Sequence, residues 1–159
     1  FSLMNAVNAM AETYDMPILY SCHPRSQKMI EKRGFRFDPR VIQSQPLGFF
    51  DYNHLQQNAF CVVSDSGTIP EEGAYFKFPA VSVRTSTERP EALDKGCFIL
   101  AGINEHDLLQ AVDIAVEMVK NEDNGIPVPN YVDENVSIKI VKLIQSYTGV
   151  VNKMVWRKY

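Results

Sequence analysis

The residues best suited to chemistry in this sequence are small and polar and follow an apolar run. The segment VVSDSGTIPEE, residues 62–72, predicts a strand, a turn containing Ser66 and Gly67, and a helix that begins near Pro70. A helix N-terminus preceded by small residues offers free backbone N–H groups to an anion such as a phosphate. The alternative is that Ser66 only caps the helix.

Two carboxylates, Glu71 and Glu72, fall in the first turn of that predicted helix. There they can complement the helix dipole, which is worth about 0.3–1 kcal/mol. A carboxylate beside a phosphate-binding turn also suits a pair of hydrogen bonds from the hydroxyls of a ribose. Both interpretations remain open from the sequence.

A second polar turn, VRTSTERPE at residues 83–91, follows the next predicted strand. Arg89 in this turn can bind phosphate oxygens through two N–H groups at once, a geometry that lysine lacks. The alternative is a solvated helix start in which glutamate and arginine side chains pair locally.

A histidine and an aromatic cluster lie close to the same predicted strand ends. His23 follows the first strand in the segment Cys22-His23-Pro24-Arg25, where a single histidine is either structural or catalytic. Phe49, Phe50 and Tyr52 begin the helix before the strand of Ser66. Most of this cluster is expected in the core, and one ring facing a cleft could stack on a base.

A sheet must position these turns at one edge. Short apolar runs predict strands over residues 17–22, 41–44, 60–64, 79–84 and 97–100. Helical periodicity predicts helices over residues 1–14, 25–32, 48–58, 69–76, 89–95 and 105–120, with Asn104 as N-cap of the last, and a final helical pattern over 136–144. The alternation indicates an α/β fold with a parallel sheet covered on both faces. Ligands bind at the carboxyl ends of such strands.

Composition excludes several classes of protein. The 159 residues have a formal net charge of -3, which argues against nucleic acid as the main partner. No apolar run approaches the roughly 18 residues of a membrane span, and no signal peptide is evident. Cys22, Cys61 and Cys97 are widely spaced in apolar runs, which predicts reduced thiols and a cytoplasmic protein. No two histidines have metal-ligand spacing and no dinucleotide or Walker A motif occurs, so neither a metal nor a cofactor is expected.

Together the two turns resemble the C-terminal half of the non-hydrolysing UDP-N-acetylglucosamine 2-epimerases. The resemblance rests on Ser64-Asp65-Ser66-Gly67 with Glu71-Glu72, and on Thr87-Glu88-Arg89-Pro90-Glu91 further along the chain. Gly96 and the run Leu100-Ala101-Gly102 also match, and the resemblance covers residues 1–119. It implies one half of a GT-B fold, which consists of two Rossmann-like domains.

The resemblance also implies a UDP-sugar ligand and a role for individual residues. Ser66 and Gly67 would hold the diphosphate, Arg89 would neutralise phosphate, and Glu72 would accept the ribose hydroxyls. Tyr52 takes the position of an aromatic ring that lies against uracil. His23 matches a histidine near the sugar end of the cleft and is the candidate catalytic residue.

The family reaction inverts C2 of the sugar by eliminating UDP and adding it back. In the family, the acid and base groups come largely from an N-terminal domain and from the start of the C-terminal domain. Neither is expected within this chain, so the chain alone is expected to be inactive. Residues 1–130 are expected to form the UDP-binding domain, and residues 131–159 a helix and tail that pack on the N-terminal domain of a full-length homodimer.

Departures from the family pattern suggest a particular branch. Thr68 and Pro70 replace a usual glycine and glutamine, and Leu47 is apolar where a uracil contact is usual. These features resemble the branch that acts on UDP-2-acetamido-2,6-dideoxy-L-talose in capsule or O-antigen biosynthesis. Two alternatives are the donor-binding domain of a GT-B UDP-sugar glycosyltransferase and a non-catalytic nucleotide-sugar sensor.

Overall fold

The computed structural model of the protein describes residues 1–123 and 128–158. The chain forms two compact units, Phe1–Val128 and Pro129–Tyr159. Residues 124–127 of the expected UDP-binding domain and Tyr159 of the expected tail lie outside the described residues.

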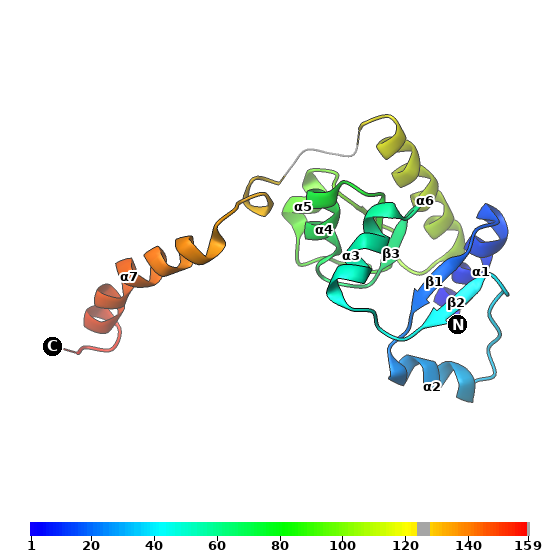
Figure 1. Ribbon diagram of the computed structural model, residues 1–159, viewed down its shortest axis with the longest axis horizontal. Helices are drawn as coiled ribbons and strands as arrows, with labels where there is room; N and C mark the ends of the chain where they lie inside the picture. The colour runs from blue at the N-terminus through cyan, green and yellow to red at the C-terminus, as the bar shows by residue number, and fades with distance from the viewer. Residues whose placement is uncertain (124–127, 159) are drawn as a thin grey trace. The chain divides into compact units, whose positions relative to one another are not determined.

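The first unit alternates helices and strands along the chain (Figure 1). In order, the elements are α1 (Ser2–Tyr14), β1 (Ile18–Ser21), α2 (Pro24–Lys32), β2 (Val41–Ser44), α3 (Phe49–Asn58), β3 (Val62–Ser64), α4 (Ile69–Phe76), β4 (Ala80–Ser82), α5 (Pro90–Asp94), β5 (Ile99–Leu100) and α6 (Glu105–Lys120). Each strand and helix predicted from the sequence is present, with ends that differ by a few residues. The α/β prediction is confirmed.

Within the described part of the chain, all strands are parallel, and they pair in two sheets. One sheet contains β1 and β2, in which Ile18 is opposite Val41, and the other has the order β3-β4-β5. In the second sheet, Val62 of β3 is opposite Ala80 of β4, and Val81 of β4 is opposite Ile99 of β5. In the β3-β4-β5 sheet, helices cover the faces of the short apolar strands, as parallel pairing requires. The β1–β2 sheet is less covered, because Leu19 and Ile42 are exposed.

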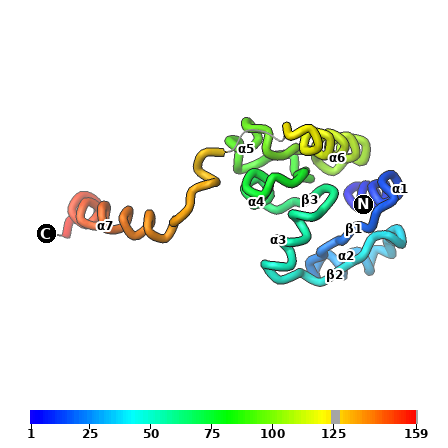
Figure 2. Tube along the Cα trace, turned by 45° about the horizontal axis from the view of Figure 1, so that its top comes forward, coloured from blue at the N-terminus to red at the C-terminus, as the bar shows by residue number. Residues whose placement is uncertain are grey.

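Helices pack on both faces of the three-stranded sheet. The buried side chain of Val81 belongs to the same core cluster as Leu108 and Val112 of α6 and Met10 of α1. Figure 2 shows α1 beside α6, in agreement with the contacts between these helices. The neighbouring residue Ala80 points the other way, because side chains alternate along a strand, and it meets α4.

The apolar stripe of α6 forms the centre of this core. Its buried residues share one helical face and are Leu108, Ala111, Val112, Ala115 and Val116. Asn104 begins the helix as predicted, with its Oδ1 accepting the backbone N–H of Asp107 at 3.3 Å. Cys22, Cys61 and Cys97 all lie within the described residues and form no disulfide there, and burial raises the pKa of Cys61 to about 12.

The second unit contains the short 3-10 helix Pro129–Tyr131 and the long helix α7 (Val136–Met154). The final helical pattern in the sequence is therefore confirmed as a helix. None of its residues is buried, and Trp156 just beyond it is 65% exposed. Among the described residues, no helix has the length and apolar character needed to cross a bilayer.

Gly73 allows α4 to lie directly on β4, and alanine there is expected to destabilise the fold. A Cβ at position 73 would lie 3.0 Å from Ala80 Cβ and 3.4 Å from the Cys97 carbonyl oxygen. Overpacking costs about 1–3 kcal/mol, and alanine recovers about 1 kcal/mol of helix propensity, so we expect Gly73→Ala to lose about 1 kcal/mol. Urea denaturation measures this loss. A free energy of unfolding equal to or above that of the wild type would contradict it.

Candidate functional site

The turn between β3 and α4 is held by its own hydroxyl groups. Ser64 Oγ accepts the backbone N–H of Ser66 at 3.0 Å, and Ser66 Oγ accepts the backbone N–H of Thr68 at 3.2 Å. Such bonds from a serine oxygen to the backbone two residues later stabilise a tight turn. The structure therefore places Ser66 and Gly67 at the carboxyl end of β3 and before α4, as the sequence predicts.

Glu72 is fixed from both sides. Thr68 Oγ1 donates to Glu72 Oε1 at 2.9 Å, and Gln56 Nε2 donates to Glu72 Oε2 at 2.7 Å. Sequence analysis did not identify Gln56. A signal was available, because Gln56 lies one helical turn after Tyr52, so the two residues share a face of α3.

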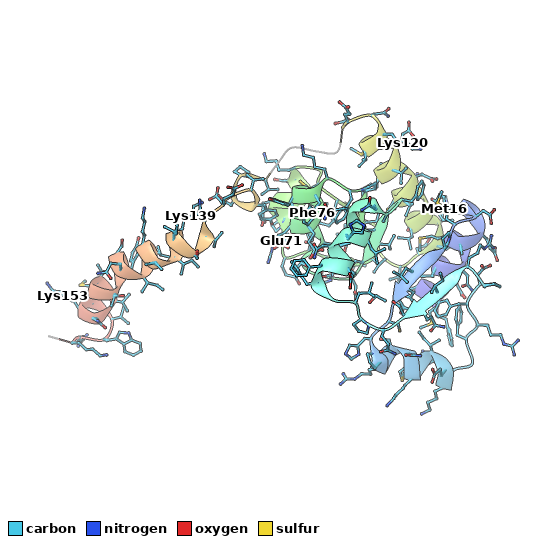
Figure 3. All side chains as sticks on the ribbon, in the orientation of Figure 1. Met16, Glu71, Phe76, Lys120, Lys139 and Lys153 are labelled. Atoms are coloured by element: carbon cyan, nitrogen blue, oxygen red, sulfur yellow. The ribbon has the colours of Figure 1, made fainter. Side chains whose placement is uncertain are left out.

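An ion pair joins the two polar turns. Arg89 Nε donates to Glu71 Oε1 at 2.5 Å, although Arg89 lies before α5. Glu71, which is labelled in Figure 3, lies in the first turn of α4. Both side chains are partly exposed, at 39% for Arg89 and 31% for Glu71. The local glutamate–arginine pair weighed in the sequence analysis also exists, but it joins Arg84 to Glu88 at 2.9 Å.

Arg84 is a second residue that sequence analysis missed. Its Nε donates to the backbone carbonyl oxygen of Asp65 at 2.6 Å, while its other end pairs with Glu88. The guanidinium thus connects the turn after β3 to the turn after β4. No local pattern predicts this contact, because its acceptor is a backbone atom distant in sequence.

Tyr52 belongs to the same cluster. It is half-buried, and burial raises its pKa. The Glu72 carboxylate raises the pKa further, whereas a hydrogen bond with Ser64 lowers it. The phenol therefore lies close to Glu72 and Ser64. Its ring comes from α3, and the three residues come from different elements.

The other aromatic residues of the cluster correct one expectation. Phe49 and Phe50 are 75% and 85% exposed, so most of the cluster is not in the core. The inward face of α3 is taken by positions 52 and 56, one helical turn apart. The two phenylalanines lie in the first turn of α3, before these positions. Their rings contact each other edge to face, with 5.6 Å between the ring centroids.

His23 lies at the end of the other sheet. It is exposed and caps α2, with its Nδ1 accepting the backbone N–H of Arg25 at 3.2 Å. An accepting Nδ1 leaves the proton of the neutral ring on Nε2. The structure thus assigns His23 a capping role, and its catalytic role stays a prediction.

The end of β1 lies near the turn after β3. Burial raises the pKa of Tyr20 to about 12, and a hydrogen bond with Cys22 and the charge of Asp65 contribute to the increase. Val41 of β2 and Val81 of β4 belong to one core cluster, so the two sheets share a hydrophobic core. In residues 1–123 and 128–158, no group of three or more His, Cys, Asp or Glu side chains is placed to hold a metal ion.

Comparison with known proteins identifies the family. The sequence profile described as UDP-N-acetylglucosamine 2-epimerase matches residues 2–145. The UDP-N-acetylglucosamine 2-epimerase of Methanocaldococcus jannaschii is 30% identical over 127 residues, which are 77% of this chain and 35% of that protein. The chain therefore spans about a third of the length of this curated relative.

Solved structures agree with this result. The UDP-N-acetylglucosamine 2-epimerase structure from Rickettsia bellii superposes with a TM-score of 0.88 at 35% identity, covering 99% of this chain and 43% of that one. The M. jannaschii enzyme, solved in complex with UDP-GlcNAc and UDP, superposes with a TM-score of 0.79 at 26% identity, covering 91% of this chain and 40% of that one. The fold is that of one half of a GT-B enzyme, and the chain belongs to the UDP-N-acetylglucosamine 2-epimerase family.

Proposed function

We propose that the protein containing this chain is a UDP-N-acetylhexosamine 2-epimerase and that the first unit supplies its nucleotide-binding half. The observation that supports this most is the Arg89–Glu71 pair of 2.5 Å, because it joins the turns after β3 and β4 at one edge of the sheet. A cation and a helix N-terminus then converge on the position where parallel α/β sheets bind anionic ligands.

Each part of UDP has a partner in this arrangement. The turn at Ser66 and Gly67 binds the diphosphate through backbone N–H groups, and Arg89 neutralises its charge. Glu72 accepts the ribose hydroxyls, and Tyr52 lies against uracil. The complex of the M. jannaschii relative with UDP-GlcNAc and UDP supports a UDP-sugar as the ligand.

The proposed reaction requires a stabilised leaving group. A base removes the proton from C2, the C1–O bond breaks, and UDP leaves with the bonding electrons to give a glycal. Reprotonation of C2 on the opposite face and attack of the UDP oxygen on C1 complete the inversion. Arg89 and the α4 N-terminus stabilise the charge that develops on the departing diphosphate. His23, whose Nε2 holds the proton in the neutral ring, donates one hydrogen bond at the sugar end.

Several finer features belong to the same proposal. The substrate is UDP-2-acetamido-2,6-dideoxy-L-talose and the pathway is capsule or O-antigen biosynthesis, as the departures at Leu47, Thr68 and Pro70 suggest. The full-length protein is a cytoplasmic homodimer. The apolar face of α7 packs on the N-terminal domain, and the 159-residue chain alone binds UDP without turnover.

Solvent labelling tests the reaction. The full-length protein is incubated in D2O with UDP-N-acetylglucosamine or with the L-talose derivative, and the products are examined by NMR. We expect the C2 epimer with deuterium at C2, because reprotonation takes its hydrogen from solvent. Transfer of an unlabelled sugar to an added acceptor would instead support the glycosyltransferase alternative, and UDP binding without any product would support a sensor.

A further inference from the structure

Gln56 is a buried polar residue that has no part in the proposed UDP binding or reaction. Its side chain lies on the inner face of α3 and the residue is 4% exposed. Its Nε2 donates to Glu72 Oε2 at 2.7 Å. The opposite amide orientation would place two acceptor oxygens against each other, so the amide N–H group must face the carboxylate.

The contacts of Glu72 leave one acceptor position on each of its oxygens. Gln56 donates to Oε2, and the Thr68 hydroxyl donates to Oε1 at 2.9 Å. A carboxylate has about four lone-pair positions, two on each oxygen. The two positions that remain, one per oxygen, match the two adjacent hydroxyls of a ribose.

Packing alone does not explain an amide at position 56. Gln56 Oε1 is buried and accepts no hydrogen bond. A methionine or leucine would fill the same space without an unpaired buried oxygen, which is unfavourable. The amide is explained if its N–H group is needed to orient Glu72. Thr68 extends the same network to the diphosphate turn, because its Oγ1 lies 2.9 Å from Ser66 Oγ.

We propose that Gln56 is a positioning residue that holds Glu72 in its diol-accepting orientation and thereby makes the site prefer ribonucleotides to 2′-deoxyribonucleotides. The inference rests on the proposed role of Glu72 as the ribose ligand. With Gln56 in place, the carboxylate meets the 2′ and 3′ hydroxyls together. Without it, Glu72 can rotate toward Thr68, and the contribution of the 2′ hydroxyl is lost.

Calorimetric titration of the full-length protein with UDP and with 2′-deoxy-UDP tests the inference. A hydrogen bond to a charged group corresponds to about a tenfold change in affinity, so we expect the wild type to prefer UDP by about tenfold. Gln56→Met keeps the volume and removes the donor. We expect this variant to reduce the preference for UDP over 2′-deoxy-UDP to about twofold or less, mainly by weakening the binding of UDP.

A matched control is available on the same helix. Gln57 is exposed and its Nε2 donates to the Asn53 carbonyl oxygen at 3.2 Å, so Gln57→Met should keep the wild-type preference. If Gln56→Met does not fold, Thr68→Val removes the other donor to Glu72 from an exposed position, and the same loss of preference is expected.

The outcomes separate the two proposals. Tight UDP binding with an unchanged preference in Gln56→Met, or in Thr68→Val where the first variant does not fold, would overturn the inference and leave the proposed function intact. Equal weakening of both nucleotides would also overturn it, because that is the result of a purely structural role. A wild type that binds neither nucleotide would overturn the proposed function and this inference with it.

Discussion

Arg89→Ala is expected to weaken UDP binding to the full-length protein by about 100-fold. Two charge-assisted hydrogen bonds from one guanidinium to phosphate contribute about 3 kcal/mol, and each 1.4 kcal/mol is a factor of ten. The structure orients this side chain before any ligand arrives: Glu71 Oε1 holds Nε at 2.5 Å, and Nη1 donates to the Glu88 carbonyl oxygen at 3.2 Å. Little side-chain entropy is therefore lost on binding.

Two variants separate the geometry of Arg89 from its charge. Arg89→Lys keeps the charge but loses the paired N–H donors of the guanidinium, so we expect an intermediate, about tenfold loss of affinity for UDP. Lys95→Ala removes the same formal charge from the exposed C-terminal end of α5 and should leave the affinity unchanged. Thermal melting accompanies each titration, because Arg89→Ala also removes the partner of Glu71. Wild-type affinity in a folded Arg89→Ala protein would refute the assigned role.

The elements of the fold were predictable because their signals are local. The apolar stripe of α6 and the N-cap at Asn104 are each formed by residues that are close in sequence, and the structure confirms both. The division of the strands into two sheets was not predictable. Pairing joins residues such as Ile18 and Val41 that are distant in sequence, and no short pattern determines which strands pair.

The candidate site shows the same limit. Ser66, Gly67, Glu71, Glu72 and Arg89 could be selected because their residue types suit an anion at a strand end. The Arg89–Glu71 pair and the Gln56–Glu72 bond could not, since each joins two elements. Phe49 and Phe50 were predicted in the core but are exposed. The reason is related, because the hydrophobic type of a residue alone does not show which helical face meets the core.

Gly67→Val is expected to weaken UDP binding by about 100-fold or more while leaving the stability of the protein unchanged. Glycine is required at a position by a positive φ, by close packing, or by the approach of a ligand. Gly102 has a φ of +71°, and Gly73 packs within 3.0 Å of Ala80. Gly67 has neither property: its φ lies outside the left-handed region, and a Cβ added there meets no atom within 4 Å.

The ligand is then the remaining reason for glycine at position 67. The diphosphate must approach the backbone N–H groups of this turn closely, and a branched side chain occupies that space. Gly67→Ala, with one methyl group, should lose less affinity than Gly67→Val. Calorimetry with UDP measures the loss, and thermal melting without ligand shows whether the fold is intact. Unchanged affinity in both variants would mean that the diphosphate does not lie against this turn, whereas a lowered melting temperature would indicate that Gly67 serves the fold.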